Sequence, residues 1–111
     1  MPYRINGNPY LDGGYRANAE NADLAVGHDR VLVLSPLGGK TLHPLDWGTR
    51  LDVQAAYLRE HGSRVETVIP GTGDEHLFGA NAMDVSLRPA AAQAGHAQGT
   101  ALAGELGEFW L

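Results

Sequence analysis

Residues 31–34 of this 111-residue chain read Val-Leu-Val-Leu, and this unbroken apolar run decides the fold class. A continuous run of Val and Leu is typical of a strand buried on both faces, as the parallel strands of α/β proteins are. Pro36, Gly38 and Gly39 follow within five residues and end the strand. We therefore expect the core to be built around residues 31–34.

Helical patterns alternate with strand patterns around this run. A short helix is expected over residues 21–26, with Asn21 as its N-cap. Further helices are predicted over residues 46–61 and from Pro89 to Trp110, with an intervening strand over residues 64–69. This order predicts an α/β fold with partly parallel strands. The small residues early in the last helix should let it lie close against the sheet.

The N-terminal residues predict a β-hairpin. Short apolar segments flank Asn6-Gly7, and an Asn-Gly pair favours the positive φ angles that a tight hairpin turn requires. Pro9 indicates an edge strand or the start of a strand. Asp12-Gly13-Gly14 then ends the second strand, because glycine permits a sharp reversal.

Composition indicates one globular domain spanning residues 1–111. Apolar residues make up 43% of the chain and charged residues 19%, as in ordinary soluble domains. A formal net charge of −5 argues against a nucleic-acid partner, because phosphate binding relies on clustered Lys and Arg. The chain has no cysteine, a polar N-terminus and no apolar run of about 20 residues, so we expect a cytoplasmic protein.

Two weaker motifs favour ordinary turns. Gly38-Gly39-Lys40-Thr41 follows a strand as a phosphate-binding loop does, but position 34, where the first glycine of that motif belongs, is leucine. Asp74-Glu75-His76 is the nearest approach to a metal cluster, and a solvated acidic turn explains it better. We therefore expect neither a metal nor a cofactor.

Asp12 is the main candidate for chemistry. A carboxylate at the end of a strand, beside two glycines, is placed to accept a proton from a hydroxyl group. The alternative is structural, because aspartate before glycine often hydrogen-bonds to its own turn.

Residues 10–34, YLDGGYRANAENADLAVGHDRVLVL, resemble the patatin-like phospholipase family. Members have an extended segment ending in Asp-Gly-Gly, an Asn-rich stretch with a short helix, and a buried strand. The same order of elements continues here to Trp110. The resemblance implies part of a three-layer α/β/α sheet and a Ser–Asp dyad that hydrolyses lipid acyl esters without a metal. It assigns Asp12 as the base, and Gly13, Gly14 and Asn21 as supports of its turn.

The chain departs from the family pattern at the nucleophile. The family serine lies in a Gly-x-Ser-x-Gly elbow that precedes Asp-Gly-Gly, and none of Ser35, Ser63 and Ser86 has that context. We therefore expect the C-terminal portion of a hydrolase domain, inactive alone, that acts on a lipid or ester only with a serine-bearing half. The alternative is a non-catalytic α/β remnant or binding module. An exposed sheet edge should promote self-association or binding of a partner chain.

Overall fold

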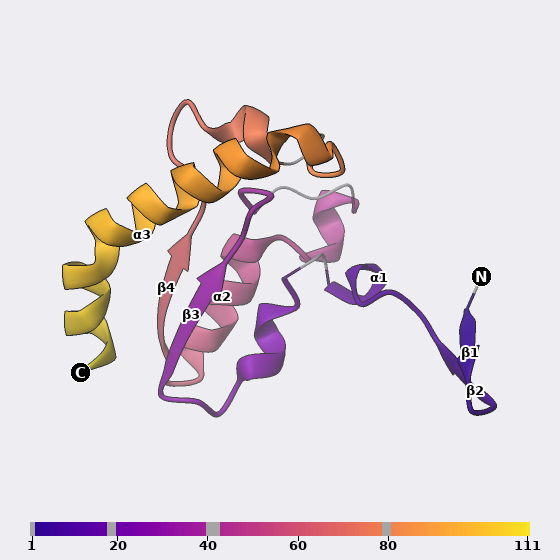
Figure 1. The fold of residues 1–111 in the computed structure, drawn as a ribbon. Helices are drawn as coiled ribbons and strands as arrows, with labels where there is room; N and C mark the ends of the chain where they lie inside the picture. The colour runs from indigo at the N-terminus through magenta and orange to yellow at the C-terminus, as the bar shows by residue number, and fades with distance from the viewer. Residues whose placement is uncertain (1, 18–19, 40–42, 79–80) are drawn as a thin grey trace.

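The chain folds into a mixed α/β structure with two small sheets and a long C-terminal helix (Figure 1). The computed structural model describes residues 2–17, 20–39, 43–78 and 81–111. The strands and α-helices are β1 (Tyr3–Ile5), β2 (Asn8–Tyr10), α1 (Gly14–Ala17), β3 (Arg30–Leu34), α2 (Leu51–Glu60), β4 (Arg64–Val68) and α3 (Arg88–Trp110). Short 3-10 helices are η1 (Ala22–Ala25), η2 (Leu45–Trp47), η3 (Glu75–Leu77) and η5 (Val85–Leu87).

The core forms where α2 covers one face of the parallel pair β3 and β4. Val31 lies opposite Val65 in the strand register, and Leu58 of α2 is completely buried against this face. Burial of these apolar side chains supplies the main stabilising free energy. The expectation of parallel strands around residues 31–34 is therefore confirmed. The buried cluster comprises Ala22, Val31, Val33, Leu51, Ala55, Leu58 and Val65.

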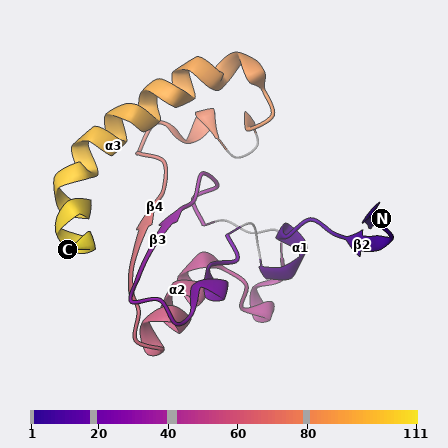
Figure 2. The same cartoon turned by 60° about the horizontal axis from the view of Figure 1, so that its bottom comes forward.

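The expectation that β3 is buried on both faces was wrong. Val31 and Val33 face α2 and are buried, but Leu32 is only half-buried and Leu34 is 68% exposed. The physical reason is that α3, which lies on the other side of the sheet (Figure 2), does not close over it. An apolar groove of about 450 Å³ remains between them, lined by Leu34, Val68, Ile69, Phe78, Leu102 and Leu106 among others.

Hydrogen bonds connect helix α3 to the end of β4 near its middle and to β3 at its C-terminal end. Gln98 Nε2 donates to the Ile69 carbonyl at 2.6 Å, and an Arg30 guanidinium nitrogen donates to the Leu111 carbonyl at 2.7 Å. Small residues do not bring the helix close to the sheet, contrary to expectation. A Cβ atom added at Gly95 or Gly99 would meet no atom of the sheet within 4 Å.

Helix α2 begins five residues later than predicted, at Leu51 in place of Asp46. Residues 45–47 form the separate turn η2, and Gly48 then takes a left-handed φ of 65°. A right-handed helix cannot continue through that conformation. The predicted last helix, by contrast, matches α3, and Pro89 lies in its first turn.

The predicted N-terminal hairpin is confirmed. Asn6 and Gly7 have φ angles of 51° and 82°, as an Asn-Gly hairpin turn requires, and β1 pairs antiparallel with β2. Residues 3–10 are exposed, and the hairpin extends away from the rest of the chain (Figure 1).

Within the described part of the chain, no helix combines the length and apolar content required to cross a bilayer, α3 included.

The amide of Gln54 joins α2 to the segment that precedes β3. Its side chain is 3% exposed, and its oxygen accepts the backbone N–H of Ala22. Its nitrogen donates to the carbonyls of Ala17 and Thr49, each at 2.7 Å. Three backbone groups that the core would otherwise leave unpaired are thereby satisfied by one side chain.

We predict that Gln54→Leu lowers the free energy of unfolding by about 2–4 kcal/mol, because leucine fits the apolar surroundings but leaves those backbone groups unpaired. Urea denaturation measures this change. The half-buried Gln98 makes one such bond, so Gln98→Leu should cost less than about 1.5 kcal/mol. Equal losses in the two variants would contradict the role given to Gln54.

Candidate functional site

The Asp-Gly-Gly segment forms a tight turn between β2 and α1. The Asp12 carboxylate oxygen Oδ1 accepts the backbone N–H of Gly14 at 2.8 Å, and the Asp12 carbonyl accepts the N–H of Tyr15 at 3.2 Å. The Asp12 side chain is exposed, and Oδ2 accepts no hydrogen bond from any residue that the structure describes. One carboxylate oxygen therefore holds the turn while the other faces solvent.

Asn21 reaches back eight residues to this turn. Its side-chain nitrogen donates to the Gly13 carbonyl at 2.7 Å. The residue has a left-handed φ of 47°, and its side chain does not cap η1. The amide thus supports the turn that carries Asp12.

The two glycines are not needed for a left-handed backbone conformation. They lie close to the side chains of Asp12 and Asn21. Neither Gly13 nor Gly14 has a positive φ. A Cβ atom at Gly14 would lie 3.2 Å from Asp12 Oδ1, and one at Gly13 would lie 3.4 Å from Asn21 Nδ2. A side chain at Gly14 would therefore crowd the Asp12 carboxylate, whereas one at Gly13 would make an ordinary van der Waals contact with Asn21.

An ion pair joins helix α1, which follows the Asp12 turn, to η1. Arg16 donates to both carboxylate oxygens of Asp23, at 2.8 and 2.9 Å. The hydrogen bonds from Arg16 hold the pKa of Asp23 below its usual value, against the opposing effect of partial burial. Together with the Gln54 amide, this pair connects the turn to η1 and α2.

Asp12 follows a strand, as expected, but it does not lie at the carboxyl edge of the parallel pair β3 and β4. The strand before it, β2, pairs only with β1 among the described strands, because the Asn-Gly turn folds it back on its neighbour. Asp12 lines neither the groove beneath α3 nor the two hollows described below.

The three serines have structural partners. Ser35, which is buried, donates to Glu20 at 2.6 Å and accepts the Gly39 N–H at 3.1 Å. Ser63 donates to the His28 carbonyl, and Ser86 donates to Asp84, both at 2.6 Å. None of these hydroxyls hydrogen-bonds to Asp12.

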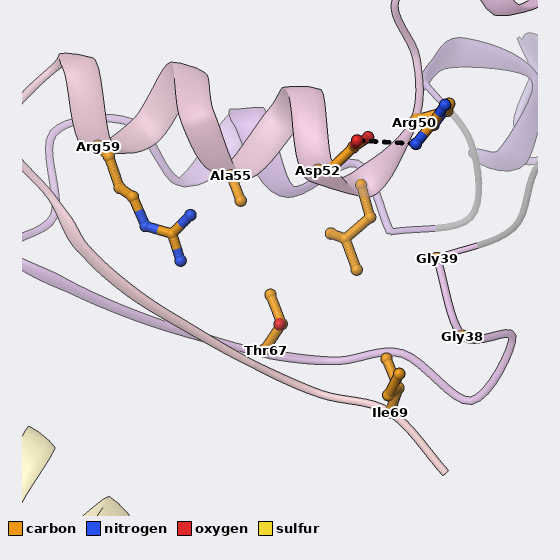
Figure 3. A pocket seen from close by; sticks show the side chains of 9 residues that line it. Gly38, Gly39, Arg50, Asp52, Ala55, Arg59, Thr67 and Ile69 are labelled. Carbon is orange, nitrogen blue, oxygen red and sulfur yellow. Dashed lines mark hydrogen bonds and ion pairs between the residues drawn. The ribbon is translucent and has the colours of Figure 1, made fainter. Parts of the chain in front are cut away.

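A hollow of about 320 Å³ lies at the carboxyl end of β4, beside the start of α2 (Figure 3). Its cations are already engaged, because Arg50 pairs with Asp52 at 2.8 Å and Arg59 donates to the Val65 carbonyl at 2.9 Å. The Gly39 N–H is also used, by Ser35. Among the described residues, each of these donors thus already has a partner within the protein. Lys40 and Thr41 of the phosphate-loop motif lie outside the described residues.

Within the described ranges, no three His, Asp or Glu side chains gather to hold a metal ion. Glu75 of the acidic loop accepts the Gly73 N–H at 2.9 Å, as a turn residue does. Comparison with protein-family models, curated proteins and solved structures gave no match to this chain. The assignment of a candidate site therefore rests on the geometry around Asp12 alone.

We predict that Arg16→Met raises the pKa of Asp23 toward the ordinary value of about 3.9. Because the folded-state pKa is depressed, the pair stabilises the protein above the unfolded-state pKa, and this stability disappears as the pH falls through the folded-state value. Carbon-detected NMR titration of the carboxyl group measures the change. An unaltered Asp23 pKa in the variant would show that Arg16 is not its cause.

Proposed function

We propose that this chain supplies the aspartate of a patatin-like Ser–Asp lipid acyl hydrolase, with the serine supplied by a separate segment or chain. The observation that carries the proposal is the fixed Asp12 turn. The Gly14 N–H and the Asn21 amide hold it, while Asp12 Oδ2 stays unpaired with any described residue. A base with one oxygen anchored and the other available is suited to accept a proton from a hydroxyl.

The chemistry requires a serine nucleophile in a Gly-x-Ser-x-Gly elbow, and this sequence contains no such elbow. The serine Oγ would attack the ester carbonyl as its proton passes to Asp12 Oδ2, and Asp12 would give that proton to the alcohol as the ester C–O bond breaks. Water would then attack the acyl-serine while Asp12 takes its proton, and Asp12 would return this proton to the serine Oγ as the fatty acid leaves. The chain contains no Gly-x-Ser-x-Gly, and its three serines are engaged elsewhere. Alone, the chain is therefore proposed to be inactive.

The surroundings of Asp12 support the need for a covering segment. Several apolar or aromatic side chains next to it in sequence are exposed, including Tyr10, Leu11 and Tyr15. Exposed apolar surface of this kind favours association. A segment that covered it would also remove water from the carboxylate, which strengthens its interaction with a hydroxyl. Helices α2 and α3 lie on opposite sides of β3 and β4 (Figure 2), and α3 leaves the apolar groove described above open.

A second candidate is a non-catalytic α/β module. The bond between Asp12 Oδ1 and the Gly14 N–H favours it, because this bond alone gives Asp12 a structural role. The two candidates differ in what Asp12 Oδ2 does.

Asp12→Asn separates them. The asparagine oxygen still accepts the Gly14 N–H, so the turn should persist, but the amide cannot act as a base. The chain should be mixed with a fragment of a patatin-like protein that carries the glycine-rich loop and Gly-x-Ser-x-Gly and ends before Asp-Gly-Gly. We expect the mixture to hydrolyse p-nitrophenyl butyrate, and Asp12→Asn to reduce the rate by about 10²–10⁴-fold.

The matched control is Asp46→Asn, at another exposed aspartate. It should leave the rate of the mixture unchanged. Full activity with Asp12→Asn would exclude Asp12 as the base. A mixture that forms a complex without hydrolysing the ester would favour the non-catalytic module.

A further inference from the structure

The outer edge of β3 carries backbone groups that pair with no residue in the described part of the chain. At the two ends of the sheet, the Arg64 N–H donates to the Asp29 carbonyl at 2.8 Å, and the Ser35 N–H donates to the Val68 carbonyl at 2.9 Å. Backbone groups alternate in direction along a strand, so Val31 and Val33 direct theirs toward β4. The N–H and carbonyl groups of Leu32 and Leu34 therefore point away from β4, and no described residue bonds to them.

The opposite edge of the sheet is partly closed. On β4 the outward carbonyl of Val65 accepts the Arg59 guanidinium at 2.9 Å, and just beyond the strand Ile69 accepts Gln98. Side chains that occupy outward groups oppose the addition of another strand. Beside β3, by contrast, a hollow of about 530 Å³ separates the strand from η1. The two edges thus differ, and β3 carries the accessible one.

The open edge is complementary to itself. The outward residues of β3 are positions 30, 32 and 34, spaced evenly about Leu32. An antiparallel copy related by a two-fold axis at Leu32 places Leu32 opposite its own equivalent and Arg30 opposite Leu34. Each such pair exchanges two backbone hydrogen bonds, so all the outward groups of the strand find partners.

Charge favours this register. Arg30 is the only charged residue in β3, and the two-fold axis places it opposite the exposed Leu34 of the other copy. No like charges face each other across the pair of strands, and Val31 lies opposite Val33 on the face covered by α2. Side chains directly opposite each other on one face of an antiparallel pair contact one another, so the two valines meet across the strands.

We propose that a second copy of this chain docks on the open edge of β3, antiparallel and centred on Leu32, to form a continuous four-stranded sheet. The inference uses no part of the proposed hydrolase site. Strand addition at an edge is a recognised mode of protein association, in which backbone hydrogen bonds supply affinity.

Sedimentation velocity over a concentration series tests the proposal. The sedimenting species should change from the mass of one chain to the mass of two as the protein concentration rises to about 1 mM, which is the range of dissociation constants for weak interfaces. Leu32→Pro removes an outward N–H without breaking the bonds to β4, and should weaken the dimer by at least about tenfold. Thr67→Pro makes the same change on the outer edge of β4, and should leave the dimer unaffected.

Charge substitutions at Leu34 test the register. Leu34→Glu places a carboxylate opposite Arg30 of the other copy and should tighten the dimer by roughly two- to tenfold, whereas Leu34→Arg should weaken it. Circular dichroism verifies that each variant is folded. A chain that stays monomeric at about 1 mM, a dimer indifferent to Leu32→Pro, or equal effects of Glu and Arg at position 34 would overturn the proposal.

Discussion

The described structure depends on one buried amide. Gln54 lies on the face of α2 that covers the sheet, yet it hydrogen-bonds to Ala17 and Ala22 on either side of the segment that precedes η1. The Asp12 turn is connected to that segment through Asn21 and, beyond it, to the core. Buried backbone groups must be paired. The Gln54 side chain therefore holds both the segment beside the core and the segment that supports the Asp12 turn.

This connection explains how a small chain holds an exposed carboxylate in a defined place. The hairpin that leads to Asp12 makes little contribution to the core, because its residues are exposed. The turn is positioned from its C-terminal side, by Asn21 and by the ion pair of Arg16 with Asp23. The proposed function needs this arrangement, because a base assists a hydroxyl only when its geometry is set in advance.

The local elements could be predicted from sequence, because each rests on a short signal. The Asn6-Gly7 pair specified the hairpin turn, and the Val31–Leu34 run specified the strand. The start of α2 was missed because the left-handed backbone at Gly48 overrides a helical pattern that continues across it. The one-sided burial of β3 was missed because periodicity does not show whether a second layer closes over a strand.

The site was less accessible to sequence reasoning. Asp12, Gly13 and Gly14 were found as a motif. The hydrogen bond from Asn21 to Gly13 spans eight residues, and no periodic pattern in the sequence indicates it. A signal for Gln54 did exist, since a polar residue within the stripe of Leu51, Ala55 and Leu58 indicates a buried hydrogen-bonding role. The hairpin's separation from the parallel sheet could not be inferred, because strand order is not encoded in local pattern.

The most direct measurement is a crystal structure of this chain bound to the serine-bearing fragment. The account predicts that the serine Oγ lies about 2.6–3.2 Å from Asp12 Oδ2, with the bonds from the Gly14 N–H and the Asn21 amide retained. A complex in which Asp12 still faces bulk solvent, with the serine beyond hydrogen-bonding reach, would contradict it.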